Sequence, residues 1–292
     1  MSGFAGLRVL ALESRRAPEL AKLISAYGGE PVVAPAMREV PLESNREALS
    51  FAAALLAGEF DMVIFLTGVG ARAVLSVAET AYKRDDYIAS LQRVKVVARG
   101  PKPVAVLREL GVTPAITVPE PNTWRELLLA LDEADASQGE LRLRGARVAV
   151  QEYGVSNHEL LSGLRERGAA VTPVPVYQWA LPNDCAPIRA AVKSIADGEI
   201  DAVLFTTSVQ VAHLLQIAAE MKLEEPMRLG LSRTIVASIG PTTSEELERQ
   251  GIRADLEPSH PKMGFLVKET AEQSAELLRR KRQGSGPGQG RA

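Results

Sequence analysis

The chain repeats its own pattern after 140 residues, and this duplication constrains the fold more than any other feature of the 292-residue sequence. The stretch Asp61–Leu75 (DMVIFLTGVGARAVL) recurs as Asp201–Leu215 (DAVLFTTSVQVAHLL). The same offset carries Arg93–Val112 onto Arg233–Ile252, and a one-residue adjustment is needed only at the first strand. Two structurally similar halves therefore follow one another along the chain.

Each half alternates short apolar stretches with amphipathic ones. The apolar stretches predict strands at 7–12, 31–35, 61–66, 94–98, 147–151, 202–205 and 234–239. The amphipathic stretches predict helices at 18–26, 49–57, 69–82 and 103–110. Thr123-Trp-Arg-Glu126 and Ser156-Asn-His-Glu159 have the spacing of capping boxes that begin two more helices. Strands that alternate with helices predict an α/β protein with mostly parallel sheets.

The composition excludes several classes of function. The net charge is −2, so no bulk positive field favours nucleic acid or an anionic membrane. Cys185 is the one cysteine, which excludes an intrachain disulfide and a cysteine-based metal site, and the three histidines lack ligand-like spacing. No leader-like segment and no apolar run near ~20 residues is present, so a cytoplasmic protein is expected.

The end of the chain reads as a tail. The segment 282–292 (RQGSGPGQGRA) is Gly-rich and polar, which predicts disorder. The adjoining basic run Arg279–Arg282 is interpreted as the solvated end of the last helix, with a nucleic-acid patch as the alternative.

Small polar residues fill four loops that each connect an expected strand to an expected helix. A helix N-terminus has free N–H groups and partial positive charge, so it binds a carboxylate or phosphate without lysines. Serine and threonine are also ordinary N-caps, but four loops at matched positions of two repeats favour an anion site. The loops are Thr67-Gly68-Val69-Gly70, Arg99-Gly100-Pro101-Lys102, Thr207-Ser208 and Gly240-Pro241-Thr242-Thr243.

Two other functions remain open at this point. Gly68-Val-Gly70-Ala-Arg-Ala73 matches the dinucleotide pattern G-x-G-x-x-A, and Arg99 could accept a 2′-phosphate, so an NADP-dependent oxidoreductase is one alternative. A non-catalytic two-lobed small-molecule-binding protein is the other, because duplicated α/β lobes also serve solute capture. No catalytic triad, paired-carboxylate or P-loop pattern is recognisable. The candidate polar groups are Tyr177, Tyr153, Arg15 and Lys102.

Over about residues 7–275, the order and spacing of six motifs resemble the uroporphyrinogen-III synthase family. The motifs are Thr67–Gly70, Val97–Lys102, Tyr153-Gly154, Val174–Tyr177, Phe205–Ser208 and Ser238–Thr243. The resemblance implies two similar flavodoxin-like domains with mostly parallel sheets, joined by a two-stranded linker, with a ligand cleft between them. It assigns 1–36 and 179–275 to one domain, 42–173 to the other, 37–41 and 174–178 to the linkers, and 276–292 to a disordered tail.

The resemblance also implies an activity. The family closes hydroxymethylbilane, a linear tetrapyrrole, into uroporphyrinogen III, with loss of water and inversion of the last ring, and uses no metal or organic cofactor. A monomeric lyase of tetrapyrrole biosynthesis is expected, which receives its substrate from hydroxymethylbilane synthase. Tyr177 matches the family tyrosine best placed to assist departure of the hydroxyl. The expected substrate contacts are Arg15, Thr67, Gly68, Val69, Gly70, Arg99, Gly100, Lys102, Tyr153, Gly154, Thr207, Ser208, Gly240, Pro241 and Thr242.

Overall fold

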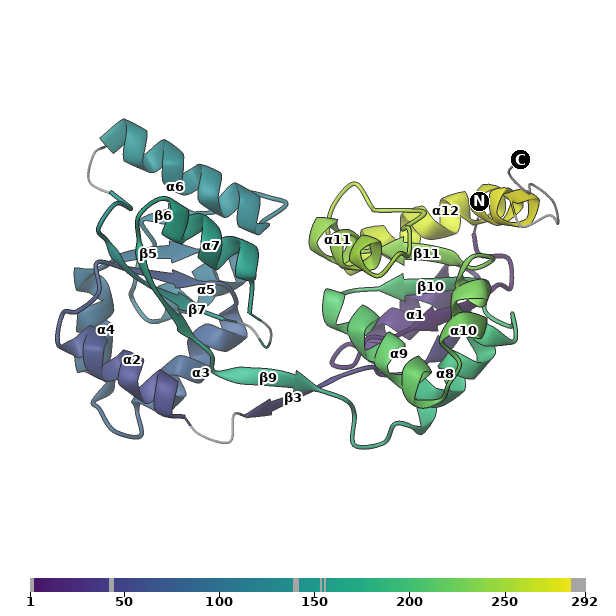
Figure 1. Ribbon diagram of the computed structural model, residues 1–292, viewed down its shortest axis with the longest axis horizontal. Coiled ribbons are helices and arrows are strands. Elements are labelled where there is room, and N and C mark those ends of the chain that lie inside the picture. Colours follow the sequence, from purple (N-terminus) through teal and green to yellow (C-terminus); the bar gives the residue numbers. More distant parts are fainter. Residues whose placement is uncertain (1–2, 42–44, 139–141, 153, 155, 285–292) are drawn as a thin grey trace. The chain divides into compact units, whose positions relative to one another are not determined.

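The computed structural model describes residues 3–41, 45–138, 142–152, 154 and 156–284. The chain divides into two compact units (Figure 1). Unit 1 consists of residues 1–38 and 180–292, and unit 2 consists of residues 39–179. Each unit is described below by itself.

The sheet of unit 1 has four parallel strands in the order β11-β10-β1-β2. Beyond β11, Leu256 makes a parallel bridge to Ala237. Every residue of β10 and β11 is buried, as expected for strands that helices cover on both faces. The strands are β1 (Arg8–Ala11), β2 (Glu30–Val33), β10 (Ala202–Phe205) and β11 (Ile235–Ser238).

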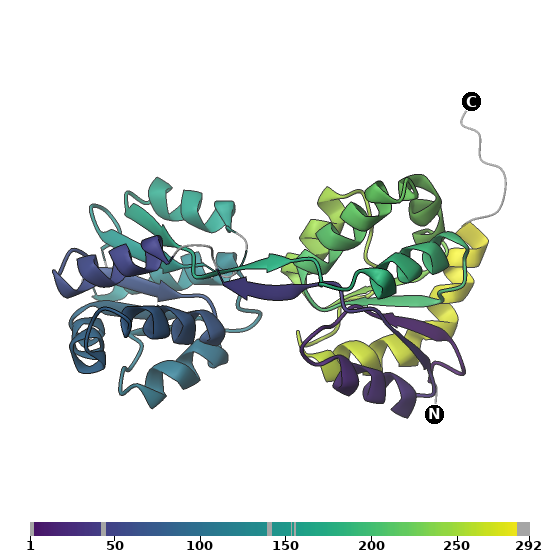
Figure 2. The ribbon, with the colours of Figure 1, turned by 90° about the horizontal axis from the view of Figure 1, so that it is seen from below.

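Helices cover both faces of this sheet, as Figure 2 shows for the purple and yellow helices on one side and the green ones on the other. One face packs around Phe4, Leu20 and Leu266, and the opposite face packs around Phe205 and Leu247. The first face carries α1 (Ala17–Ala26) and α12 (Met263–Gly284), and the second carries α8 (Ala186–Ala196), α9 (Ser208–Glu220), α10 (Glu224–Leu231) and α11 (Pro241–Arg249).

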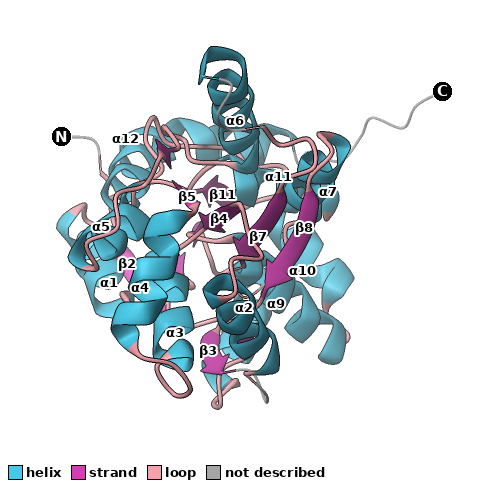
Figure 3. Cartoon of the chain, turned by 90° about the vertical axis from the view of Figure 1, so that its left-hand side faces the viewer, coloured by secondary structure: helices cyan, strands magenta, loops and turns pink. Residues whose placement is uncertain are grey.

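The sheet of unit 2 has five parallel strands in the order β6-β5-β4-β7-β8 (Figure 3). The strands are β4 (Met62–Phe65), β5 (Lys95–Ala98), β6 (Ile116–Thr117), β7 (Arg147–Gln151) and β8 (Ala170–Val174). One face carries α2 (Arg46–Leu56), α3 (Gly68–Ala78), α4 (Arg84–Arg93) and α5 (Pro101–Glu109), and the other carries α6 (Trp124–Gln138) and α7 (His158–Glu166).

The duplication is visible in both sheets. The elements β4, α3, β5 and α5 recur 140 residues later as β10, α9, β11 and α11. Each unit nevertheless joins a strand–helix–strand segment of one half to the remainder of the other half. In equivalent terms both sheets have the doubly wound order 2-1-3-4, which is the flavodoxin-like pattern. The chain passes between the units at β3 (Arg38–Pro41) and β9 (Tyr177–Ala180), which pair as a two-stranded sheet.

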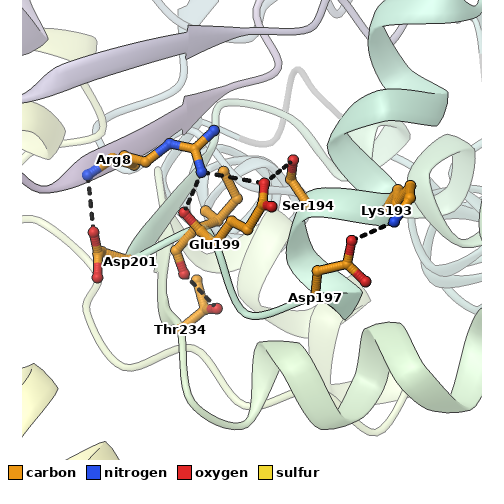
Figure 4. Close-up of polar contacts among 8 residues, drawn as sticks. Arg8, Lys193, Ser194, Asp197, Glu199, Asp201 and Thr234 are labelled. Carbon is orange, nitrogen blue, oxygen red and sulfur yellow. Dashed lines mark hydrogen bonds and ion pairs between the residues drawn. The ribbon is translucent and has the colours of Figure 1, made fainter.

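An arginine at the start of the first strand anchors the amino ends of the strands in each unit. In unit 1 the Arg8 backbone N–H donates to Asp201 Oδ2 over 2.9 Å, and its guanidinium donates to the Glu199 carbonyl oxygen over 3.0 Å (Figure 4). In unit 2 the Arg147 backbone N–H donates to Asp61 Oδ2 over 2.8 Å, and Arg147 Nη2 donates to Asp61 Oδ1 over 2.8 Å. This edge of each sheet is therefore occupied by internal ion pairs.

Replacing Asp61 by asparagine is expected to weaken the protein at neutral pH but not in acid. Hydrogen bonds from Arg147 lower the pKa of Asp61 below its ordinary value of 3.8, so its stabilising effect is complete above that value and is lost as the pH falls through the lowered pKa. Both side chains are about half exposed, so the loss at pH 7 should be below ~1 kcal/mol. Urea unfolding at pH 7 and pH 2.5 measures this difference, and an equal difference at both values would contradict the prediction.

Three details differ from the sequence prediction or refine it. The N-cap of α7 is Asn157, which accepts from the Leu160 N–H over 2.7 Å, and not Ser156, whose hydroxyl donates to Glu152. The helix α4 was not predicted, because it buries only the narrow stripe of Tyr87, Ser90 and Leu91. The capping box at Thr123 is confirmed, since its N–H donates to Glu126 Oε2 over 2.9 Å.

The predicted tail begins too early, because α12 continues to Gly284. Leu277 and Leu278 are buried, and Lys281 Nζ lies 2.8 Å from Asp255 Oδ2 with both side chains largely covered. These contacts hold the last turns of the helix against unit 1. Residues 285–292 of the predicted tail lie outside the described residues.

Candidate functional site

Each sheet has a point at its carboxyl edge where two neighbouring strands send their helices to opposite faces. In unit 2 the neighbours are β4 and β7: α3 packs with the Val63–Phe65 face, whereas α7 packs with the Met62–Ile64 face. In unit 1 the corresponding neighbours are β10 and β1, followed by α9 and α1. Such switch points are where doubly wound sheets bind ligands, because the diverging loops leave a crevice.

Thr67 forms the start of α3 at the switch point of unit 2. Its Oγ1 accepts from the Gly70 N–H over 3.0 Å, and its own N–H donates to Gln151 Oε1 over 3.3 Å. Val69 in the first turn is 38% exposed, so this turn is accessible. The helix start combines free backbone N–H groups with the positive end of the helix dipole, which suits an anionic group.

Tyr177 is brought to the same threonine from β9. Its ring is 5% exposed, and its hydroxyl oxygen lies 3.5 Å from Thr67 Oγ1. The Trp179 ring meets it edge to face, with 5.5 Å between the ring centroids and 83° between the planes. Gly154, with φ of 68°, lies against the indole, and a Cβ there would be 2.2 Å from Trp179 Cδ1. The phenol is thus held at the switch point by packing, while Tyr153 lies outside the described residues.

The loop after β5 supplies the second predicted set in unit 2. Gly100, with φ of 87°, is the N-cap of α5, and its lack of a Cβ leaves room for Asn122 Oδ1, which would lie 2.6 Å from that Cβ. Arg99 is half-buried just before it, and Lys102 is exposed in the first turn. Another helix start with an adjacent cation therefore lies at the same edge of the sheet.

In unit 1 the predicted residues also head helices. Thr207 is the N-cap of α9 without a side-chain capping bond, and Ser208 begins the helix. Gly240 is the N-cap of α11, followed by Pro241 and Thr242 in its first turn. Arg15 is exposed in the loop after β1. The predicted residues within the described part of the chain thus lie in two sets, one at the carboxyl edge of each sheet.

The two glycines of the dinucleotide-like pattern are required by packing within the protein. A Cβ at Gly68 would lie 2.7 Å from the Lys102 carbonyl oxygen. A Cβ at Gly70 would lie 2.0 Å from Gln151 Nε2. In a dinucleotide site the second glycine lets the backbone approach a pyrophosphate, whereas here that space holds a glutamine. The NADP alternative is therefore not favoured.

The switch point of unit 1 contains the same amide group delivered from the opposite side. Gln210 stands where α3 has Gly70, and its Oε1 accepts from the Thr206 N–H over 2.7 Å. Leu12 stands where β7 has Gln151, as the strand register shows. Both glutamine side chains are buried and both accept from the backbone that follows the central strand.

Exchanging this pair in unit 2 is expected to be tolerated better than either single change. Gly70→Gln alone should cost about 2 kcal/mol, because the new side chain meets the buried Gln151. Gln151→Leu alone should cost about 1 kcal/mol, because the Thr67 N–H loses its acceptor. The double variant recreates the Leu12 and Gln210 arrangement of unit 1, so its loss should be smaller than the sum. Urea unfolding of the four proteins measures the coupling, and strict additivity would contradict this reading of the two sites.

Sequence reasoning missed four residues at the switch points, namely Gln151, Gln210, Glu13 and Glu152. The signal for the glutamates was present in the one-residue adjustment at the first strand. With it, Glu13 aligns with Glu152 at a spacing of 139 residues, immediately beyond the first strand of each unit. Without a known strand register, neither residue stands out among 36 acidic residues.

The described residues contain no group of three or more histidine, cysteine or acidic side chains arranged to hold a metal ion. Among the helices so described, none has the length and apolar character that crossing a membrane requires.

Comparison with known proteins identifies the family. The family model for uroporphyrinogen-III synthase HemD matches residues 18–268. An uncharacterized Bacillus subtilis (strain 168) protein, YjjA, is 31% identical over 92% of this chain and 97% of its own length. A Methanothermobacter thermautotrophicus protein provisionally named uroporphyrinogen-III synthase is 32% identical over 82% of this chain and 87% of its own length.

Solved structures agree with this. Wild-type uroporphyrinogen III synthase from the extremely thermophilic bacterium Thermus thermophilus is 26% identical, with a TM-score of 0.54 over 94% of this chain and 99% of that one. A mutant of the same Thermus protein is 24% identical, with a TM-score of 0.70 over 94% of this chain and 100% of that one, a likeness of fold. The chain belongs to the uroporphyrinogen-III synthase HemD family.

Proposed function

We propose that the chain closes hydroxymethylbilane into uroporphyrinogen III, with loss of water and inversion of the last pyrrole ring. The observation that carries the proposal is the family match over residues 18–268. The arrangement of helix starts at the carboxyl edge of each sheet supports it. In classification terms the enzyme is a cyclising lyase of tetrapyrrole biosynthesis.

The substrate chemistry fits these helix starts. Each pyrrole of the bilane carries an acetate and a propionate, so the ligand is a flexible polyacid. The starts of α3, α5, α9 and α11 offer free backbone N–H groups that bind carboxylates without a cluster of lysines. Distributed weak sites suit a ligand whose charges are spread along its length. We assign Thr67, Thr207, Ser208 and Thr242 to these contacts.

The chemical step needs one weak acid and a defined pose. The hydroxymethyl C–O bond breaks, the oxygen leaves with the electron pair, and Tyr177 gives it the proton that makes water. The pyrrole nitrogen lone pair delocalises the resulting positive charge. The first ring then attacks to form the new C–C bond, and a proton released on rearomatisation returns to the Tyr177 phenolate. Selection of the inverted product depends on the folded pose of the bilane more than on acid strength.

The same proposal includes the setting of the reaction. We place the enzyme in the cytoplasm as a monomer that receives a short-lived substrate from hydroxymethylbilane synthase. Size-exclusion chromatography with light scattering tests the monomer, and a dimer at micromolar concentration would exclude it.

The decisive experiment supplies freshly made hydroxymethylbilane and separates the product isomers by chromatography after oxidation. The expected product is predominantly uroporphyrin III, whereas the enzyme-free control gives uroporphyrin I. Type I product at the rate of the control would overturn the proposed function.

A further inference from the structure

A carboxylate lies at the switch point of each unit, in equivalent positions. Glu13 follows β1 and Glu152 follows β7, each directly beyond the first strand of its sheet. The Glu152 N–H donates to the Val174 carbonyl oxygen over 3.1 Å, so the residue is anchored by the ladder between β7 and its neighbour. The duplication has kept this residue type at both positions, although most of the surrounding side chains differ.

Both carboxylates are held by a hydroxyl group. The Ser156 hydroxyl donates to Glu152 Oε1, and Glu152 is 8% exposed. The Thr206 hydroxyl donates to Glu13 Oε2 over 2.7 Å, and the Arg16 N–H donates to Glu13 Oε1 over 3.3 Å. Neither carboxylate forms an ion pair among the described contacts. Each therefore keeps its negative charge at the end of the sheet where ligands bind.

This charge is opposite to what a site for carboxylates needs. Two like charges about 4 Å apart repel each other strongly near a protein surface, so the polyacid cannot place its acetates or propionates against these glutamates. The group that meets them must donate hydrogen bonds or carry positive charge. The pyrrole N–H groups of the bilane meet the first requirement, and the cation formed on loss of the hydroxyl meets the second.

We propose that Glu152 and Glu13 accept hydrogen bonds from pyrrole N–H groups and stabilise the cationic intermediate, one residue in each unit. This inference rests on the proposed function. The carboxylates form and break no covalent bond. They act on the charge that appears when the C–O electron pair leaves, and fixed charges of this kind stabilise a transition state without reorganisation. They also direct the substrate carboxylates away from the switch points and toward the helix starts.

Replacing each carboxylate by its amide separates these effects. Glutamine keeps an acceptor oxygen for the pyrrole N–H but removes the charge. The kcat of Glu152→Gln should fall by roughly 10²-fold, because the cation loses its counter-charge. The KM should fall or stay unchanged, by up to about fivefold, because a like charge no longer opposes the polyacid. Glu13→Gln should show the same pair of changes.

The test measures kcat and KM for hydroxymethylbilane in wild type, Glu152→Gln, Glu13→Gln and the control Glu109→Gln, which removes an exposed carboxylate on α5. Lower kcat without higher KM in both test variants, and wild-type values in Glu109→Gln, support the proposal. A raised KM, or wild-type kcat in a folded variant of lower thermal stability, overturns it and leaves Glu152 as a structural partner of Ser156. If wild type forms no type III product, the proposed function fails instead. If one variant does not fold, the other decides the outcome.

Discussion

Replacing Tyr177 by phenylalanine is expected to lower kcat for ring closure by ~10²–10⁴-fold, the usual range for loss of a general acid. The hydroxyl is the group removed, and it lies 3.5 Å from Thr67 Oγ1 at the start of α3. KM should change little, because phenylalanine keeps the ring that packs against Trp179. Some activity should remain, since orientation of the bilane does not depend on the phenol. Initial rates over a range of substrate concentrations measure both parameters.

Tyr87→Phe provides a matched control in the same unit. Tyr87 is 1% exposed, burial raises the pKa of its phenol, and its hydroxyl has no hydrogen-bond partner within the described structure. Removing that hydroxyl should leave kcat unchanged and stability equal or higher, because an unpaired polar atom leaves the core. A Tyr177→Phe enzyme with the wild-type rate would remove Tyr177 from the mechanism. Complete inactivity in a folded variant would give it a larger role than acid assistance.

The repeat pattern predicted much of the fold because it is a property of spacing. The α/β class, the mostly parallel sheets and the helix starts at Thr67, Gly100, Thr207 and Gly240 are confirmed. Strand–loop–helix transitions of this kind depend on local residue preferences that persist in both copies. Membership of the uroporphyrinogen-III synthase family is likewise confirmed, from motifs that lie in these same loops.

What sequence could not predict depends on contacts between distant residues. The amide at the switch point comes from the strand in unit 2 and from the helix in unit 1, so the compensation between Gln151 and Gly70 is visible only once the two are known to touch. The shift of the α7 cap from Ser156 to Asn157 has a similar origin, because Glu152 recruits the serine hydroxyl. The carboxylates at the switch points required the register of the first strand.

Replacing Gly230 by alanine is expected to lower the free energy of unfolding by about 3 kcal/mol or more. In an ordinary helix position this change is favourable, since alanine is the better helix former. Here α10 crosses α8 so closely that a Cβ at position 230 would lie 1.9 Å from the Ile195 carbonyl oxygen, a backbone atom that cannot rotate away. The equivalent residue of unit 2 is Ser90, which shows that its α2–α4 pair accepts a side chain at this position.

Gly264→Ala on α12 is the matched control, because nothing lies within 4 Å of its added Cβ. That variant should be neutral or slightly stabilised in urea unfolding, while Gly230→Ala unfolds at a clearly lower urea concentration. Equal midpoints for the two variants would mean that α8 and α10 can separate at little cost. The close approach of these helices, which no pattern in the sequence reveals, would then not be a determinant of the stability of unit 1.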